Sequence, residues 1–266
     1  MSDEVIDAQR RVWTIGDYPV IARHLLPISV ETVATVGVRA GDRVLDVGVG
    51  NGNAAIEAVR RGATVTGIDL TPAQIERARS RCAVEGVEVD LRVGNAERLD
   101  VPDGAFDVVL SVMGVIFAPD HERAIAEMAR ACRPGGTVAI TTWAEDGWSG
   151  RWRSRAARLL PVPPPGRPAP DEWGDPDEVV RRFATARLRA TVERRSFAFR
   201  FPTEEDALET FVGAAGPYVQ FMETAAELGL AEEARRELRA VLAETNEADD
   251  GTCRLPAPYL LAVSQR

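Results

Sequence analysis

Hydrophobic and polar positions follow two periods between residues 43 and 143. Five short apolar runs are separated by stretches in which apolar residues recur three or four positions apart. Continuous or alternating apolar runs are typical of strands, and the longer spacing is typical of helices. The predicted strands are 43–48, 64–69, 87–93, 106–112 and 137–143. Strands that alternate with helices predict an α/β fold with a doubly wound parallel sheet.

Helix starts within this region carry their own signals. A helix is predicted over residues 53–61. Thr71 can cap the next helix, Pro72 suits its first position, and Gln74 can close a capping box. Asp120 can cap a third helix, whose first turn places His121 at the surface.

The pattern changes beyond residue 143. Residues 161–170 contain six prolines, which predict an irregular loop. Residues 191–201 read as one long strand, and residues 203–247 as mostly helical with breaks near Gly213, Gly216 and Pro217. Residues 258–264 read as a final strand. We expect one domain that carries helical additions, without repeats.

Composition narrows the possible chemistry. All 32 basic residues are arginine, so lysine-dependent Schiff-base enzymes, Walker phosphate loops and protein kinases are excluded. The net charge of −9 argues against nucleic-acid or anionic-membrane partners. No apolar run approaches the length of a membrane span. The polar start at residues 1–11 does not resemble a signal peptide, so a cytoplasmic protein is expected. The three cysteines lack the spacing of a metal site, so no metal is expected.

A glycine loop follows the first predicted strand. Gly48, Gly50 and Gly52 come directly after Asp46, and the next strand ends in Asp69. Glycines adopt positive φ and let the backbone approach a ligand closely. An acid at the end of the second strand can accept hydrogen bonds from ribose hydroxyls. The loop and the acid together predict a ligand that contains adenosine.

The glycine spacing separates two kinds of adenosine ligand. The G-x-G-x-G pattern differs from the G-x-G-x-x-G of dinucleotide-binding folds. Asp46 would repel a diphosphate, but it suits the α-ammonium group of S-adenosylmethionine, which has no phosphate. The sequence therefore favours S-adenosylmethionine, with S-adenosylhomocysteine as the product.

These motifs resemble those of class I S-adenosylmethionine-dependent methyltransferases, especially the small-molecule branch of quinone and natural-product biosynthesis. The resemblance covers residues 39–143, including an R-P-G-G turn at 133–136. It implies that the loop from Asp46 to Gly52 wraps the methionine part of the cofactor. It also implies that Asp69 holds the ribose and that Leu70 packs beside adenine.

Two further segments match the family. In the segment Gly94-Asn95-Ala96-Glu97, Asn95 stands where the family has an aspartate that accepts a hydrogen bond from adenine. Ser111 ends the fourth strand, which faces the methionine part. The resemblance implies a Rossmann-like sheet of seven strands with the last one antiparallel.

The resemblance also divides the single domain, residues 1–266, into four segments. Residues 1–38 form an N-terminal helical lid, and residues 39–143 form the cofactor-binding core. Residues 144–189 are a Trp- and Pro-rich insertion. Residues 190–266 supply the last strands, with a helical cap at about 203–247.

The predicted lid contains the candidate catalytic groups. Tyr18 can cover the sulfonium with its aromatic face, or belong to an ordinary packed helix. His24 can act as a general base for an acceptor hydroxyl, or be a histidine without a catalytic role.

Aromatic residues after the fifth strand predict a pocket for a planar or apolar acceptor, although they can equally fill a core. With Tyr18, the candidates are Trp143, Trp148, Phe211, Tyr218 and Phe221.

The predicted function is methyl transfer from S-adenosylmethionine to a small organic acceptor by in-line displacement. The alternatives are a cyclisation or decarboxylation on the same fold, a nicotinamide-dependent oxidoreductase and a non-catalytic cofactor-binding subunit. The sequence leaves open the acceptor atom (O, N, C or S) and the formation of a homo-oligomer.

Overall fold

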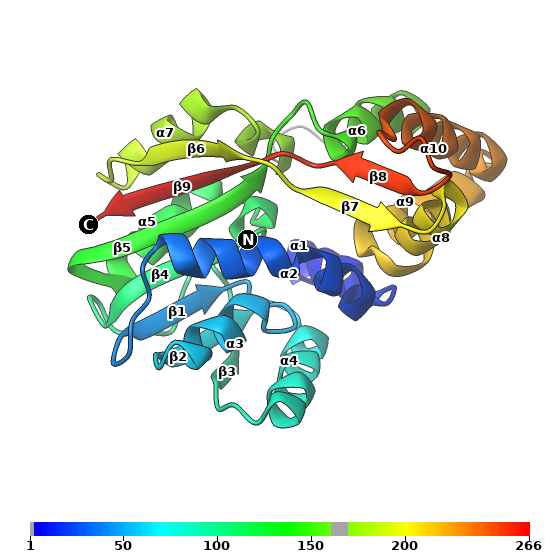
Figure 1. Cartoon of the computed structure of the whole chain (residues 1–266). Coiled ribbons are helices and arrows are strands. Elements are labelled where there is room, and N and C mark those ends of the chain that lie inside the picture. Colours follow the sequence, from blue (N-terminus) through cyan, green and yellow to red (C-terminus); the bar gives the residue numbers. More distant parts are fainter. Residues whose placement is uncertain (1–2, 161–169) are drawn as a thin grey trace.

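The computed structural model describes residues 3–160 and 170–266, which form one large sheet beside a small one (Figure 1). The strands of the large sheet lie in the order β3-β2-β1-β4-β5-β9-β6. In chain order they are β1 Arg43–Val47, β2 Thr64–Asp69, β3 Asp90–Val93, β4 Phe106–Val112, β5 Cys132–Trp143, β6 Thr191–Arg195 and β9 Tyr259–Gln265. The small sheet pairs β7 Ala198–Phe201 with β8 Cys253–Pro256.

The large sheet is wound outward in both directions from β1 and β4. β1 pairs in parallel with β2 and β4, and β4 in parallel with β5, whereas β9 runs antiparallel to β5 and β6. The predicted fold class is confirmed, including seven strands with the last one antiparallel. The predicted start of the third strand at residue 87 is wrong, because pairing with β2 begins only at Asp90.

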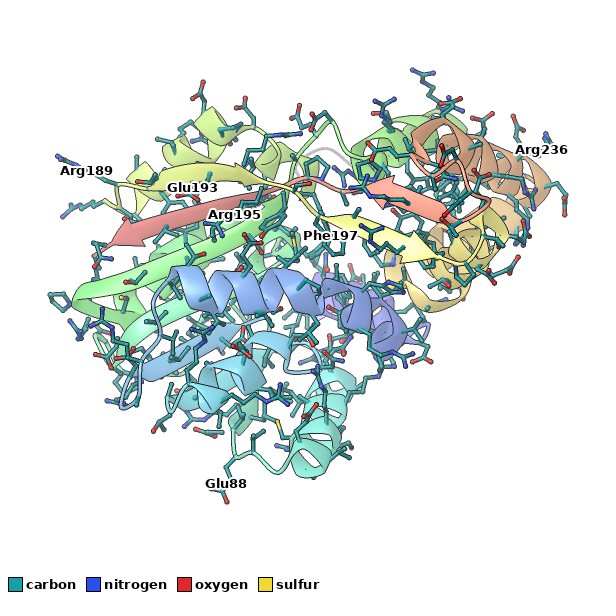
Figure 2. The ribbon with its side chains drawn as sticks, viewed as in Figure 1. Glu88, Arg189, Glu193, Arg195, Phe197 and Arg236 are labelled. Carbon is teal, nitrogen blue, oxygen red and sulfur yellow. The ribbon has the colours of Figure 1, made fainter. Side chains whose placement is uncertain are left out.

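The prediction of one strand over residues 191–201 is also wrong. The chain leaves the large sheet after Arg195 and enters the small sheet at Ala198. Figure 2 shows Phe197 at this transition, where its carbonyl accepts a hydrogen bond from the N–H of Ala257. The partner strand is interrupted at the same level by Pro258, which has no N–H to donate to a ladder.

Helices cover both faces of the large sheet, with α2 and α3 in front of it and α5 behind it in Figure 1. The helices are α1 Asp3–Thr14, α2 Tyr18–Thr35, α3 Asn53–Arg60, α4 Pro72–Glu85, α5 His121–Ala131, α6 Trp148–Leu159, α7 Pro176–Thr185, α8 Glu204–Ala214, α9 Gly216–Glu227 and α10 Ala231–Thr245. Short 3₁₀ helices are η1 Val115–Phe117 and η2 Pro170–Trp173.

Helices α6, α8, α9 and α10 gather beside the small sheet (Figure 1). The predicted helical character of residues 203–247 is confirmed. The first break falls at Ala215, between the glycines named by the prediction, and a second break at 228–230 was not predicted. The proline-rich loop predicted at 161–170 lies, except for its last residue, outside the described residues.

The central strands separate two hydrophobic cores. Val44 and Val108 point to the core beneath α3 and α4, whereas their neighbours Leu45 and Val109 point to the core on the other face. All four side chains are buried. This alternation follows from the pleat of a strand, and burial on both faces explains why these strands read as nearly continuous apolar runs.

The start of α4 differs from its prediction in one detail. Thr71 occupies the N-cap position and Pro72 follows it, but Thr71 makes no capping hydrogen bond through its side chain. The Thr71 N–H instead donates to Asp69 Oδ1 at 2.9 Å. The predicted capping box is wrong, because the Gln74 amide donates to the carbonyl of Trp13 at 3.0 Å.

The start of α5 also differs from its prediction. Asp120 caps the helix as predicted, but His121 is buried and not exposed, at 2% of its full accessibility. Its Nε2 lies 3.2 Å from the carbonyl of Ile116, and Arg182 contacts its Nδ1. Burial and this guanidinium lower the pKa of His121 to about 4. Helix α7 and η2, distant in sequence, cover the first turn of α5.

Backbones approach closely where the N-terminal helices meet α8 and α9. A Cβ built on Gly216 would lie 1.9 Å from the carbonyl oxygen of Val12. Gly16, which has a φ of +75°, lies against the backbone of Ala214 in the same way. A side chain at Gly216 would force α1 away from α9, and one at Gly16 would force the turn after α1 away from α8.

We expect Gly216→Ala to lower the free energy of unfolding by about 1–3 kcal/mol, because the methyl group overpacks a backbone contact. Gly213→Ala is the matched control, since a Cβ there meets nothing within 4 Å. In the helix interior, alanine should stabilise the protein by about 0.5–1 kcal/mol relative to glycine. Urea unfolding of both variants measures the difference. Equal midpoints for the two variants would contradict the close packing of α1 on α9.

Candidate cofactor site

A pocket opens at the carboxyl ends of β1, β2 and β4, where ligands bind in doubly wound sheets. The cavity itself has a volume of about 100 Å³, within a concavity of about 740 Å³ that is open to solvent. The residues that line it are Gln9, Trp13, Tyr18, Val47, Gly48, Gly50, Ile68, Asp69, Leu70, Thr71, Gln74, Gly94, Asn95, Ala96, Met113, Gly114, Val115, Phe117, Ala118 and Pro119.

The predicted glycine loop forms the floor of this pocket. Gly48, Gly50 and Gly52 have φ angles of 76°, 54° and 90°, which side chains rarely adopt. The N–H of Gly48 donates to the carbonyl of Ile68 at 2.7 Å, so the loop folds back onto the end of β2. Gly48 and Gly50 line the pocket, whereas Gly52 lies behind it as the N-cap of α3.

Asp69 lies at the end of β2 and faces the loop. Its Oδ2 accepts the Gly50 N–H at 3.0 Å, and its Oδ1 accepts the Thr71 N–H at 2.9 Å. Burial raises its pKa above the ordinary aspartate value, and these hydrogen bonds oppose the shift. Each carboxylate oxygen keeps a lone pair after one backbone bond. The carboxylate can therefore accept further hydrogen bonds from a ligand.

Asp46 lies beneath the loop and not on the pocket surface. It is 2% exposed and accepts a hydrogen bond from the backbone N–H of Ala55. Burial, with a smaller contribution from Asp69, raises its pKa to about 7. Two neighbouring carboxylates thus give the site a negative potential that favours a cationic ligand.

Aromatic side chains form the side of the pocket that faces the N-terminal helices. Tyr18 lies against the loop, and its Cε1 would be 3.3 Å from a Cβ on Gly50. The Trp13 ring meets Tyr18 edge-on at 5.8 Å and Phe117 at 4.7 Å. Burial raises the pKa of Tyr18 well above its ordinary value, so its hydroxyl stays protonated at neutral pH.

Two predicted cofactor residues support the walls without lining the pocket. Glu97 Oε1 accepts the N–H of Asp120 at 2.9 Å. Ser111 is buried, donates to the carbonyl of Val47 at 2.5 Å and accepts the N–H of Val115 at 3.0 Å. Both side chains tie together segments that do line the pocket.

The residues that were predicted to lie beside adenine are neighbours in the structure. Leu70, Asn95 and Ala96 all line the pocket. Asn95 Oδ1 already accepts the backbone N–H of Glu97 at 2.8 Å, which fixes the orientation of the amide. The second lone pair of this oxygen leaves room for one more donor.

Sequence reasoning missed several lining residues. Met113 and Gly114 follow β4 at the same edge of the sheet, and Met113 has a φ of +53°, which is unusual for a side-chain-bearing residue. Their place directly after a predicted strand was the available signal. Gln74 reaches the pocket beside Trp13, where α1 meets α4, and the local pattern does not reveal that contact.

The predicted acceptor aromatics form a packed cluster. Trp148 lies 4.3 Å from Phe211 and stacks on Tyr218 at 5.6 Å, and Trp152 meets Phe221 at 4.8 Å. Trp148 and Phe211 are buried. Trp143 lies apart from them, near Phe197 and Phe199. Of the six predicted acceptor residues, Tyr18 alone lines the described pocket.

His24 does not line the pocket. Its ring lies 4.8 Å from Phe201 and 5.8 Å from Phe199. Six residues along a helix turn the side chain by about 240° from the direction of Tyr18. Burial, with a smaller contribution from Arg23, lowers the pKa of His24.

Among residues 3–160 and 170–266, no group of three or more His, Cys, Asp or Glu is arranged to hold a metal ion. No helix in that part of the chain is long and apolar enough to cross a bilayer.

Known proteins are similar to this chain in sequence and in fold. Residues 45–140 match the family described as a methyltransferase domain. An uncharacterized protein of Mycobacterium tuberculosis is 42% identical over 215 residues, which cover 77% of each chain. The YcgJ protein of Bacillus subtilis has a similar fold, with a TM-score of 0.60 and 20% identity over 90% of this chain and 98% of its own.

Two relatives with assigned activities match shorter parts of the chain. A phosphatidylethanolamine N-methyltransferase of Cereibacter sphaeroides is 42% identical over 111 residues, which cover 41% of this chain and 54% of that protein. The 27-O-demethylrifamycin SV methyltransferase of Amycolatopsis mediterranei is 41% identical over 105 residues, which cover 38% of this chain and 39% of that protein.

We expect Asp46→Asn to stabilise the ligand-free protein at pH 8 by roughly 1–3 kcal/mol, because it removes a buried charge but keeps the Ala55 hydrogen bond. The folded-state pKa of about 7 exceeds that of the unfolded chain. The protonated Asp46 carboxyl therefore makes its full contribution to the free energy of unfolding below about pH 4. This contribution is lost as the pH rises through 7.

Chemical unfolding of wild type and Asp46→Asn between pH 5 and 8 measures this effect. The stability difference should grow with pH and level off above pH 7. Parallel pH profiles for the two proteins would show that Asp46 ionises normally.

Proposed function

The chain belongs to the class I S-adenosylmethionine-dependent methyltransferases, and we propose that it methylates a small organic acceptor. Its cofactor is S-adenosylmethionine. The bound cofactor supplies a methyl group already activated by a sulfonium. The acceptor attacks the methyl carbon in line as the carbon–sulfur bond breaks, which leaves S-adenosylhomocysteine. The protein then has to orient the two reactants and exclude water.

The observation that carries the cofactor part of this proposal is the pair of buried carboxylates around the glycine loop. Asp69 faces the pocket with free lone pairs, which suits ribose hydroxyls, and Asp46 adds negative charge beneath the loop. A diphosphate would meet this charge unfavourably, which argues against the nicotinamide alternative. The loop backbone from Gly48 to Gly52 is proposed to wrap the methionine part.

The remaining cofactor assignments concern residues in the walls of the pocket and residues that hold these walls in place. Leu70, Asn95 and Ala96 are proposed to flank adenine, as their positions in the pocket lining allow. Glu97 and Ser111 are proposed to act through the segments that they hold in place. Residues 1–38 are proposed to form the lid, because Trp13 and Tyr18 of this segment line the pocket.

The acceptor side is proposed from the aromatic cluster and from the ionisable side chains of the pocket. The aromatic cluster around Trp148 and Tyr218 suits an apolar acceptor that enters by separating packed rings. Within the described lining, Tyr18 and Asp69 are the ionisable side chains. Tyr18 stays protonated at neutral pH, and Asp69 is assigned to the ribose, so neither is proposed as the base. A nucleophile that loses no proton before attack therefore fits the pocket better than one that needs His24.

The biological setting is proposed from charge and relatives. A net charge of −9 favours a small acceptor in the cytoplasm over nucleic acid or an anionic membrane. The relative that acts on demethylrifamycin supports a role in natural-product or quinone metabolism. The lipid headgroup amine of the Cereibacter enzyme is a second small acceptor class.

Binding of S-adenosylhomocysteine tests the cofactor. At one hundred times its Kd, a ligand raises the free energy of unfolding by about 2.7 kcal/mol. For a chain of this size we expect a Tm increase of roughly 5 °C. NAD⁺ at the same concentration is the control and should produce no shift. A shift with NAD⁺ alone would reverse the assignment. If S-adenosylhomocysteine does raise the Tm, transfer of a labelled methyl group from S-adenosylmethionine separates methylation from other chemistry.

Tyr18→Ala should weaken S-adenosylmethionine binding about 3- to 30-fold, because the ring faces the site of a cationic sulfonium. S-adenosylhomocysteine has no sulfonium and should lose less affinity, and Tyr18→Phe should bind both ligands almost normally. Calorimetric titration measures these constants. Equal losses for the two ligands would remove the cation–π contribution.

His24→Ala is the matched control on the same helix, since its side chain packs on Phe199 and Phe201. Cofactor affinity should stay within about twofold of wild type. This variant also tests the general-base hypothesis, which fails if turnover is near normal at every pH.

A further inference from the structure

We infer that His121 is a positioning residue of the cofactor pocket: its neutral imidazole holds the wall at residues 115–119 against helix α7 and so sets how tightly the cofactor binds. This inference rests on the proposed function, because it takes S-adenosylmethionine as the ligand of the pocket. It gives a role to a buried histidine that the methyl-transfer reaction itself does not use.

The wall follows β4. Val115, Phe117, Ala118 and Pro119 line the pocket, whereas Ile116 between them is fully buried in the core. Residues 115–117 form the short 3₁₀ helix η1. A single turn of this kind has few hydrogen bonds of its own and a poor geometry for them. Contacts from other segments therefore decide where the wall lies.

Side chains from different segments hold the wall. Ser111 and Glu97 accept backbone N–H groups at its two ends. In its middle, Nε2 of His121 lies 3.2 Å from the carbonyl of Ile116. His121 differs from the other two, because its second ring nitrogen contacts Arg182 of α7. The imidazole thus lies between the wall and a helix some sixty residues further along the chain.

The two partners of His121 select one form of the imidazole. A guanidinium can only donate hydrogen bonds, so Nδ1, which Arg182 contacts, has no proton. The carbonyl of Ile116 can only accept, so Nε2 carries the proton and donates it. The neutral imidazole with its proton on Nε2 is the form that satisfies both contacts.

The charged groups that face the imidazole keep it neutral. They are Arg182 of α7, Glu172 of η2 and Asp120 of α5 itself. Burial and the guanidinium lower the pKa of His121 to about 4, and the two carboxylates oppose this shift only in part. A second proton would place an N–H of the ring against the guanidinium. The contact with the wall therefore stays the same at neutral pH.

Arg182 gives the wall a fixed neighbour. It is buried, and its Nη2 and Nε each lie 2.8 Å from a carboxylate oxygen, of Glu172 and Glu178 respectively. Its guanidinium lies 5.1 Å from the centre of the Trp173 ring, which meets the imidazole at 5.2 Å. A buried guanidinium that is paired in this way is held firmly, because leaving its charge unpaired is unfavourable.

A displaced wall would change the pocket. The rings of Phe117 and Trp13 meet at 4.7 Å, and both residues line the pocket. Without the hydrogen bond at Ile116, the turn that carries Phe117 would sample several positions. The cofactor would then have to order the wall when it binds, and this entropic cost lowers its affinity.

His121→Phe is the main test, because it keeps a ring against Trp173 but removes both nitrogens. We expect S-adenosylhomocysteine to bind about 3- to 10-fold more weakly in calorimetric titration, which corresponds to the loss of one hydrogen bond. In the absence of ligand, hydrogen exchange of the amides at residues 115–118 should be faster than in wild type. Either wild-type affinity or wild-type exchange in this variant would overturn the inference.

His121→Gln and His121→Asn separate the two contacts of the imidazole. The amide nitrogen of glutamine can reach the position of Nε2 and donate to Ile116, whereas the shorter asparagine reaches only the position of Nδ1. Affinity and exchange should be close to wild type in His121→Gln and close to His121→Phe in His121→Asn. Equal effects in the two variants, or the reverse order, would overturn the inference. If His121→Phe does not fold, this pair carries the test.

Val179→Ala is the matched control for a general loss of packing. Val179 is fully buried in α7, and its truncation removes no hydrogen-bonding group. It should lower the Tm, as His121→Phe does, but leave the affinity for S-adenosylhomocysteine within about twofold of wild type. If it weakens binding as much as His121→Phe, the effect follows from lower stability in this region and the inference fails.

The form of the imidazole is tested directly by nuclear magnetic resonance of wild type with ¹⁵N-labelled histidine. Between pH 5 and 8 the proton should remain on Nε2 and Nδ1 should remain bare. A proton on Nδ1 in this range would overturn the inference.

Failure of the proposed function is distinguishable from failure of this inference. If wild type does not bind S-adenosylhomocysteine, the proposed function is overturned. If wild type binds it normally and the exchange of residues 115–118 does not respond to the substitutions of His121, the inference alone is overturned.

Discussion

The hydrogen bond from the Gly50 N–H to Asp69 joins the loop after β1 to the end of β2, and the geometry of the pocket depends on it. The loop reaches the carboxylate only because Gly48 and Gly50 hold positive φ angles. A side chain at Gly48 would also collide with Gly114 after β4. Three neighbouring strands therefore converge on one small backbone arrangement, which leaves space for a ligand at their carboxyl ends.

The same arrangement confines two carboxylates in a region of low polarity. Burial raises the pKa of both Asp46 and Asp69, which means that their charged forms destabilise the ligand-free fold. A cationic ligand offsets part of that unfavourable energy when it binds. Stability lost at a binding site in this way is common where function requires a charge in a closed space.

The sequence predicted the parts of the molecule whose contacts are local or repeated. The strands of the core, the glycine loop and Asp69 follow from the apolar runs and from residues placed directly after them. The errors lie where a distant segment decides the environment. His121 is buried because Arg182 and Trp173 reach it from α7 and η2. The strand at 191–201 divides because Pro258, far along the chain, interrupts its partner.

Distant contacts also decide which side chains complete the pocket. Trp13 enters the lining because α1 crosses α4, and α1 is held on its other side by α9, where Gly216 lies against Val12. Arg11 adds a surface ion pair to Glu223 of α9 at 3.0 Å. Since α9 also carries Tyr218 of the aromatic cluster, displacement of α1 would disturb both the cofactor wall and the proposed acceptor side. Helices α1 and α9 are thus linked by direct packing, and if the proposed lid and cap admit cofactor and acceptor, the entry of both should depend on this contact.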